Sequence, residues 1–530
     1  MNNRRFTGFG ILYLSVSLTV LAVLLFVRIP QKMWWADYLP LRGERHWPML
    51  VVGVFATVFV GWLCRMVCRH VRPRRIYLLL ASMALLAMQI ETVHSYYFYT
   101  NWDVQQVTGA AQAMATGEPT AGFRWYFDNY PNNLFITRLF ALVFWLSGPI
   151  FGTEVHYFLL LVVQCVASWL AGLMLFQIAK HMWQSNTCAL FAWVLYCLLV
   201  AVSPWWSIPY SDVWGLVVIV SVIWLSTAAP TERRGLVIVL VAALSVVGYY
   251  IKPQTVFVLF SAVILMICTN DLKARTLRTY IRPACHALLG VAAGLIIVYA
   301  STVGSGMRMH SEKNMGAAHY LMIGANQQTL GMYSDSDLDF SRSFSDNSQR
   351  RKAQLRKVAE RYDAMGAWKS ATFWSRKTLM NFSDGTFSWG HEGNFFREIP
   401  PRQGVVASSA RKVYYAPSLG GSLNVAYSVA ATAVWFAVLL LSVFAVVPIF
   451  RRKSGKSAAD SRVAAALMLS VVCIVLFHAL FECRARYLFC QTPVFILLAV
   501  QGAASLCACA RDLLPKLSGR RGGSERKTTV

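Results

Sequence analysis

Runs of about 20 apolar residues follow one another along the chain, and short polar segments separate most of them. An α-helix of about 20 residues is long enough to cross about 30 Å of hydrocarbon. This pattern predicts an all-α polytopic membrane protein and excludes a soluble globular chain. The runs lie at 6–29, 48–68, 76–98, 134–151, 157–179, 187–203, 213–229, 235–250, 255–269, 284–302, 424–449, 464–482 and 488–509.

The composition agrees with this prediction. Hydrophobic residues make up 56% of the 530 residues and charged residues only 14%, whereas soluble domains carry about 25% charged residues. The net charge of +26 is expected to orient the spans, because Lys and Arg concentrate on the cytoplasmic side of membrane proteins. No basic soluble face is visible, so nucleic acid is not expected as a partner. The 12 cysteines show neither a disulfide framework nor a metal-type spacing.

Four basic clusters set the expected topology, and they lie at 69–75, 273–282, 451–456 and in the C-terminal tail. They share the cytoplasmic side only if one apolar run does not cross. The run 134–151 fits this role, because it follows a Pro-Asn-Asn turn, contains Arg138 and breaks at Gly148-Pro149. We expect it to lie in the outer interface or to re-enter. About twelve transmembrane helices remain, with both termini inside.

Polar segments then divide the chain. The long segment 303–423 is expected to form an extracytoplasmic mixed domain, with a helix over 345–365 that Ser345 or Asp346 caps. The tail 510–530 is expected to be basic, cytoplasmic and disordered. The predicted order is N-terminal spans (1–98), a first outer loop with the interfacial helix (99–156), a central transmembrane bundle (157–302), the extracytoplasmic domain (303–423), C-terminal spans (424–509) and the tail (510–530).

The outer loop 101–133, NWDVQQVTGAAQAMATGEPTAGFRWYFDNYPNN, holds the first candidate residues. Asp103 follows an interfacial aromatic belt over residues 96–99. Asp103 and Gln106 also have the spacing of a capping box for a helix over 104–116, which is the structural alternative. Carboxylates, amides and aromatic rings together serve sugar recognition and base catalysis. The loop supplies them at Arg124, Trp125, Tyr126, Asp128, Asn129, Tyr130 and Asn132.

Charged residues gather at two further expected outer ends of spans. Asp212 ends the loop SPWWSIPYSD, where the alternative role is a helix N-cap. The segment FECRARY contains Glu482, Arg484, Arg486 and Tyr487. Paired Arg donors suit a phosphate, and the alternative is that the arginines snorkel to the interface with the glutamate as counter-ion.

Two other places carry weaker signals. Lys252, in YIKPQT, is a single cation at the expected outer end of a span. His391 and Glu392 form a candidate metal pair in the outer region. One His beside one Glu is more often a plain surface pair, because a zinc site uses three or four ligands. The sequence therefore predicts no metal site built from protein side chains.

These segments resemble the GT-C superfamily of membrane glycosyltransferases, which includes the protein O-mannosyltransferases and the lipid A aminoarabinose transferases. Those enzymes share a first outer loop with an Asp, a helix ending in a small-residue and Gly turn, an aromatic stretch, a Pro-containing turn and an interfacial helix. The corresponding segments here are NWDVQQVTGAAQAMATGE, FRWYFDNYPNN and LFITRLFALVFWLSGPIFG. SPWWSIPYSD resembles the family's loop ending in Tyr-x-Asp, and HALFECRARYLFCQTP resembles its Glu-x-Arg-Tyr-Leu element. The match covers about 95–310 and 460–500.

The resemblance implies an integral membrane glycosyltransferase that moves a sugar from a polyprenyl-phosphate donor to a glycan, lipid or protein acceptor on the extracytoplasmic face. It implies Asp103 as the general base, and Arg484, Arg486 and Lys252 as ligands of the donor phosphate. The residues implied for the acceptor and the sugar are Arg124, Trp125, Tyr126, Asp128, Tyr130, Asn132, Asp212, Glu482 and Tyr487. No cofactor is required by the resemblance, and the need for a divalent cation stays open.

The expected setting is a bacterial plasma membrane, where such an enzyme would serve cell-envelope assembly, and the alternative is the endoplasmic reticulum. Other functions with this many spans are a multi-span transporter and a flippase or polymerase of lipid-linked glycans. Transporters tend to show internal repeats and acids inside their spans. This chain shows no repeat, and its acids concentrate on the expected outer face. A polymerase would use the same donor on the same face, and it stays open.

Overall fold

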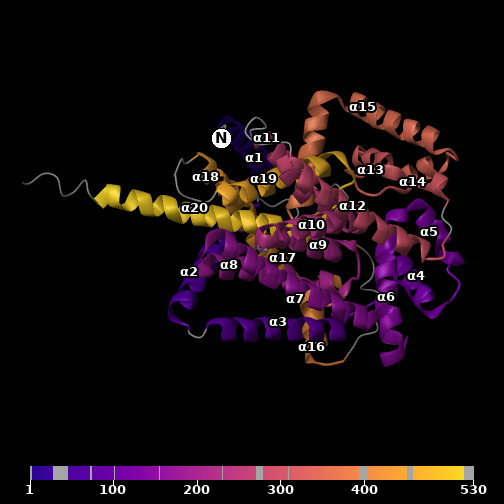
Figure 1. Cartoon of the computed structure of the whole chain (residues 1–530), viewed down its shortest axis with the longest axis horizontal. Coiled ribbons are helices and arrows are strands. Elements are labelled where there is room, and N and C mark those ends of the chain that lie inside the picture. Colours follow the sequence, from indigo (N-terminus) through magenta and orange to yellow (C-terminus); the bar gives the residue numbers. More distant parts are fainter. Residues whose placement is uncertain are drawn as a thin grey trace, which may run out of the picture.

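The computed structural model describes residues 3–27, 46–71, 74–100, 102–153, 156–228, 231–269, 278–307, 310–390, 392, 403–450 and 458–518. Within these ranges the chain is helical and contains no strand, which confirms the all-α polytopic prediction (Figure 1). The helices are α1 (Asn3–Phe26), α2 (Trp47–His70), α3 (Arg74–Tyr96), α4 (Asp103–Thr116), α5 (Arg124–Asn129), α6 (Leu134–Phe151), α7 (His156–Trp183), α8 (Asn186–Tyr196), α9 (Ser211–Ala228), α10 (Arg234–Ile251), α11 (Phe257–Thr269), α12 (Arg278–Val303), α13 (Gly316–Gly324), α14 (Asp335–Arg342), α15 (Asn347–Phe382), α16 (Val405–Tyr414), α17 (Asn424–Val443), α18 (Val447–Phe450), α19 (Ala458–Leu480) and α20 (Thr492–Ser518).

Every predicted apolar run is a helix in the described part of the chain. There, eleven helices are long and apolar enough to cross a membrane, and the segments Asn186–Ala201 and Pro253–Val263 are shorter apolar helices. The eleven include Pro131–Phe151, so length and composition do not separate α6 from the spanning helices. Its interfacial position therefore stays a prediction at this point.

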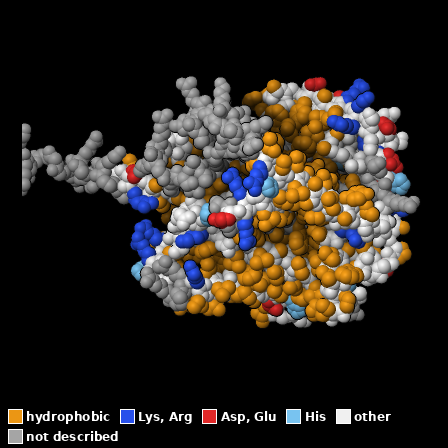
Figure 2. Space-filling view, in the orientation of Figure 1, with side chains coloured by type: hydrophobic (Ala, Val, Ile, Leu, Met, Phe, Trp, Pro, Cys, Tyr) orange, Lys and Arg blue, Asp and Glu red, His pale blue; other side chains and the backbone are white. Residues whose placement is uncertain are grey.

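The helix bundle is apolar on its outside and closely packed within. Phe55, Leu288 and Ile296 are each more than 60% exposed, and Figure 2 shows a broad hydrophobic surface of the kind that lipid covers. Helices α10 and α12 approach each other at two glycines of α12. A Cβ atom at Gly290 would meet a backbone carbonyl of α10, and one at Gly294 would lie 2.9 Å from another. Small residues allow such close contact where lipid provides no hydrophobic driving force between helices.

The outer region corrects one prediction. Its described residues between 303 and 423 form helices and short turns without any strand, so this is not a mixed domain. The reason is the composition of its longest segment, α15, which is rich in Lys, Arg, Gln, Glu and Ala, and these residues have high helix propensity.

Helix α15 confirms one predicted cap, and its first part ends where the predicted helix 345–365 ends. The side chain of Asp346 caps it by accepting a hydrogen bond from the backbone N–H of Gln349 at 2.7 Å. Helical geometry is interrupted at Gly366, which has φ 63° and ψ 178°, and a second helical segment then runs to Phe382. That φ is readily available only to glycine.

The outer region docks on the segment that joins α19 to the next turn. The backbone N–H groups of Glu482 and Cys483 donate to the carbonyl oxygens of Tyr320 and Gly331, each at 2.9 Å. The buried Lys377 of α15 donates to the carbonyl oxygen of the residue before Glu482 at 2.8 Å. The outer helices therefore fix the position of this segment.

The C-terminal end corrects another prediction. Helix α20 continues to Ser518, so residues 510–518 are helical, and only 519–530 of the predicted tail lie outside the described residues. Ala, Leu, Arg and Lys after 508 favour continued helix. The basic segments at 273–277 and 451–456 also lie outside the described residues, so the assignment of membrane sides stays a prediction.

Candidate functional site

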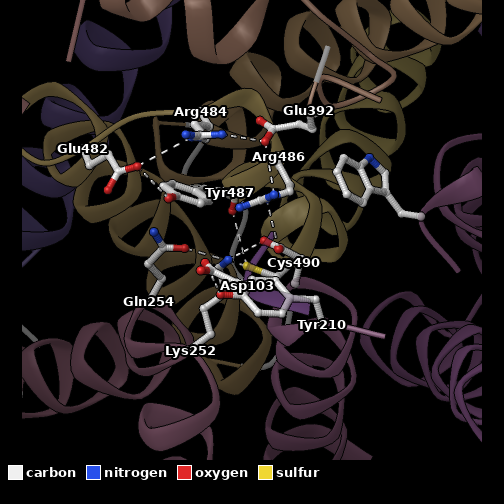
Figure 3. Close-up of polar contacts among 12 residues, drawn as sticks. Asp103, Tyr210, Lys252, Gln254, Glu392, Glu482, Arg484, Arg486, Tyr487 and Cys490 are labelled. Carbon is white, nitrogen blue, oxygen red and sulfur yellow. Dashed lines mark hydrogen bonds and ion pairs between the residues drawn. The ribbon is translucent and has the colours of Figure 1, made fainter. Parts of the chain in front are cut away.

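Five segments that are far apart in the sequence meet at one end of the central helices (Figure 3). The start of α4 brings Asp103, and the start of α9 brings Tyr210 and Asp212. The end of α10 brings Lys252, and the segment before the 3-10 turn Ala485–Gln491 brings Glu482 and Arg484. Arg486 and Tyr487 lie in that turn, and Glu392 comes from the chain after α15. We call the seven charged residues of this set the charged cluster, namely Asp103, Asp212, Lys252, Glu392, Glu482, Arg484 and Arg486.

Asp103 does not cap its helix. Trp102 is the N-cap residue of α4 and makes no side-chain capping bond, and Asp103 is the first helical residue. The capping-box alternative is therefore wrong. Instead, one carboxylate oxygen of the half-buried Asp103 accepts a hydrogen bond from the Tyr210 hydroxyl at 2.9 Å.

A short polar chain supports this contact. The Asn133 amide lies within 3.4 Å of the Tyr210 hydroxyl oxygen and donates to the Tyr126 hydroxyl at 2.5 Å. Burial, followed by the negative charge of Asp103, raises the pKa of the Tyr210 hydroxyl well above its usual value. The hydroxyl therefore stays protonated at neutral pH and can donate to the carboxylate.

Asp212 is also not a cap. It lies inside α9, one residue after its start, and is 1% exposed. One carboxylate oxygen pairs with the ammonium group of Lys252, and the other lies 3.3 Å from Nε of Arg486. Burial of a carboxylate is costly unless cations compensate it, and here two buried cations do so.

Both arginines of FECRARY are paired with acids. Arg486 is 5% exposed, and both arginines face Glu392, whose Oε2 accepts from Arg484 at 2.7 Å and from Arg486 at 3.1 Å. Burial alone would lower the pKa of Arg484, but the charge of Glu392 raises it well above its usual value. Nε of Arg484 lies 3.5 Å from Glu482. Burial raises the pKa of the Glu482 carboxyl. The charge of Arg484 acts in the opposite direction, but the net shift is upward.

Aromatic rings surround the cations. The Arg486 guanidinium lies 4.5 Å from the ring centroid of Trp102, 5.6 Å from that of Tyr210 and 5.7 Å from that of Tyr487. The Lys252 ammonium lies 4.6 Å from the Tyr487 centroid. Cation–π contacts of this kind gain strength when the pair is desolvated, so the rings hold the two cations in place.

Several predicted residues lie apart from the charged cluster. Arg124 and Trp125 are exposed, and the structure does not join them to it. Asn132 donates to Asn133 at 3.1 Å and so acts through that residue. Tyr130 packs on Tyr126, with ring centroids 5.3 Å apart. Burial, followed by the charge of Asp103, raises the pKa of Tyr130 to about 12.

Asp128 connects two parts of the molecule and does not face the charged cluster. Its buried carboxylate accepts from the backbone N–H of His310 at 2.7 Å and from the imidazole of the same residue at 2.9 Å. Lys313 lies 3.7 Å away. Burial raises the pKa of Asp128, but the hydrogen bonds and charges of these partners outweigh it, and the net shift is downward. The contacts made by Asp128 account for its burial by tying the outer loop to the start of the outer region.

Sequence analysis did not identify Tyr210, Asn133, Trp102 and Glu392 as site residues. Tyr210 lies two positions before a predicted candidate, and that proximity was the available signal. Glu392 was weighed only as a metal ligand. Among the described residues, no group of three or more His, Cys, Asp and Glu side chains is placed to hold a metal ion, and His391 lies outside them. The need for a divalent cation stays untested.

A protein-family model described as "Conserved hypothetical integral membrane protein" matches residues 47–505. The match includes every residue of the charged cluster. No curated protein and no solved structure matches the chain.

Proposed function

The chain belongs to this family of conserved hypothetical integral membrane proteins, and we propose that it is a glycosyltransferase of the GT-C type. It would use a polyprenyl-phosphate sugar as donor and work at the extracytoplasmic face of a bacterial plasma membrane. One observation carries the proposal. The carboxylate expected to act as base and the three cations expected to bind phosphate lie in one cluster, although they span more than 380 positions of the sequence (Figure 3).

In this proposal Asp103 takes the proton of an acceptor hydroxyl. The acceptor oxygen then forms a bond to the anomeric carbon of the sugar, and the bond from that carbon to the phosphate oxygen breaks. The electron pair leaves with the polyprenyl phosphate, and the proton remains on Asp103. A positioned base of this kind contributes about 10²–10⁴-fold.

The cations have the complementary task. Arg484, Arg486 and Lys252 would bind the donor phosphate and stabilise the negative charge that grows on it as the bond breaks. Guanidinium groups provide paired donors whose spacing fits phosphate oxygens. The side chain of Arg484 is 26% exposed, so it is the cation that an incoming headgroup reaches first.

The position of the charges favours an enzyme over a transporter. The members of the charged cluster lie at helix starts, helix ends and the turn before α20, near where a lipid headgroup and its acceptor meet. A transporter would place such groups near the middle of its spans.

Sugar transfer in vitro tests the proposal. Purified protein in detergent receives a panel of radiolabelled polyprenyl-phosphate sugars, with native membrane extract as acceptor. We expect transfer from one donor, and a decrease of about 10²–10⁴-fold in Asp103→Asn. Glu118→Gln is the matched control, because Glu118 is an exposed carboxylate in the same loop. Full activity of Asp103→Asn would reject the base, and lipid binding without transfer would favour a flippase or transporter.

A further inference from the structure

Glu392 is the shared counter-ion of the two arginines. A single oxygen, Oε2, accepts hydrogen bonds from Arg484 at 2.7 Å and from Arg486 at 3.1 Å (Figure 3). Its side chain is 3% exposed, whereas that of Arg484 is 26% exposed. Arg484 is therefore the more exposed member of this pair, and the carboxylate that it shares with Arg486 is buried.

A phosphate group would fit the same donors. A phosphodiester has two non-bridging oxygens that share one negative charge, and each arginine offers several N–H donors in a planar fork. A carboxylate that bridges two guanidinium groups is therefore similar in charge and in acceptor geometry to the group that the proposed donor would bring. It occupies the space that this group would need.

The charge of the cluster favours exchange over addition. The cluster contains four carboxylates and three cations, which gives a formal charge of −1. A phosphodiester bound in addition to Glu392 would change the formal charge of the cluster to −2. The cluster is mostly buried, and uncompensated charge is costly there. A phosphodiester that replaces the carboxylate on the arginines keeps the charge around them unchanged.

We propose that Glu392 occupies an anion subsite between Arg484 and Arg486, and that the phosphate of the donor displaces its carboxylate on binding. The identity of the ligand rests on the proposed function. Glu392 is then a resident competitor that sets the affinity for the lipid phosphate and lets the product leave. It is a specificity-determining residue and takes no part in the bond changes.

The alternative role of Glu392 is a permanent brace that holds the two arginines in position. The two roles predict opposite effects of removing its charge. If Glu392 is a competitor, a neutral side chain at this position binds the arginines less strongly, so the phosphate binds more tightly. A brace, once neutralised, leaves the arginines misplaced, so the phosphate binds more weakly.

Direct binding separates the two roles. Radiolabelled polyprenyl phosphate is titrated onto the full-length protein in detergent, with wild type, Glu392→Gln, Glu392→Asp and Arg484→Gln compared. We expect about tenfold tighter binding by Glu392→Gln and about tenfold weaker binding by Arg484→Gln. Glu392→Asp keeps the charge but reaches less far, so we expect it to bind more tightly than wild type and less tightly than Glu392→Gln. Unchanged or weaker binding by Glu392→Gln overturns the proposal.

Further arms identify the group that is recognised and guard against misfolding. Uncharged polyprenol should show no difference between wild type and Glu392→Gln, and inorganic phosphate should compete better in the variant. Thermal unfolding in detergent checks that each variant is folded. If Glu392→Gln does not fold, the binding of Glu392→Asp is used to test the proposal. If Glu392→Gln binds polyprenyl phosphate more tightly but the protein transfers no sugar, the anion subsite is supported and the proposed function is rejected. Sugar transfer together with weaker binding would reject the inference alone.

Discussion

Asp103 is held at one oxygen only. Tyr210 donates to Oδ2, and within the described part of the chain no second hydrogen bond reaches this carboxylate. Since Asn133 in turn contacts the Tyr210 hydroxyl, the direction of this hydroxyl is fixed before any substrate arrives. The remaining oxygen of the half-buried carboxylate is available to an acceptor hydroxyl. Tyr210 is thus a positioning residue in the proposed reaction.

Replacing Tyr210 by Phe tests this role. The variant keeps the ring but loses a hydrogen bond to a charged group, which is worth about 1.5–3 kcal/mol. We expect kcat to fall about 10- to 100-fold with little change in KM for the donor, as measured by sugar transfer. A change confined to KM would contradict the role, and Tyr249→Phe, on the half-exposed face of α10, is the control.

For single residues, the sequence could identify candidates for the site but could not decide between their alternative roles. Asp103 and Gln106 satisfy the spacing of a capping box, and Asp212 precedes an apolar helix as a good cap would. Nothing local distinguishes these alternatives from the observed pairing. The deciding partners are 107 positions away for Asp103 and 40 for Asp212, so they depend on how the helices pack.

The segment 481–484, which precedes the 3-10 turn, is held by the outer region. Residues 481–484 follow α19 without regular structure, yet the outer region supplies partners for the backbone groups of Phe481, Glu482 and Cys483. Gly324, the last residue of α13, passes against it so closely that a Cβ atom would overlap the backbone of Leu480 and Phe481. The outer region is therefore part of the site, since it places the arginines.

Gly324→Ala should displace this segment. Backbone cannot give way as a flexible side chain can, so overpacking here is expected to cost about 1–3 kcal/mol of stability. We expect a lower thermal unfolding temperature in detergent and loss of polyprenyl-phosphate binding. Gly8→Ala is the matched control, because nothing lies within 4 Å of the position of its Cβ atom. Wild-type binding in Gly324→Ala would show that the segment is held in other ways.

The elements themselves were largely predictable, and their contacts were not. Length and hydropathy predicted each helix of the bundle, and an Asp-containing cap signal predicted the start of α15. No pattern in the sequence could place Glu392 against Arg484, because 92 positions separate them and neither lies in a periodic segment. The prediction of a mixed domain for the outer region was wrong for its described residues. A long polar segment gives a weaker sequence signal for a helix than an amphipathic segment does, because it lacks a regular apolar stripe.

For the whole molecule, the site itself limits the topology. Asp103 and Tyr210 are hydrogen-bonded, so they lie at the same depth, and the helices between them must cross the membrane an even number of times. Three apolar helices lie between them, namely α6, α7 and α8. One of these therefore does not cross, and this conclusion uses no information about charge.

Helix α6 is the one that fits. It carries Arg138 and Pro149, and in Figure 1 it runs across the direction of α3 and α20. The remaining intervals agree with this choice. Helices α9 and α10 lie between Asp212 and Lys252, and four apolar helices lie between Lys252 and Glu482. Both numbers are even, and with α6 excluded the total is the twelve spans that the basic clusters predicted.

Cysteine labelling tests this topology. Single cysteines are introduced at the exposed positions Glu118, Thr153 and Gln184, in a background whose 12 native cysteines are replaced, and intact cells are treated with a membrane-impermeant maleimide. If α6 does not cross, Thr153→Cys reacts as Glu118→Cys does, and Gln184→Cys reacts only after permeabilisation. If α6 crosses, Thr153→Cys behaves as Gln184→Cys is expected to. In that case α7 or α8 would have to remain on one side to keep Asp103 beside Tyr210, although α7, at 28 residues, is longer than a bilayer requires.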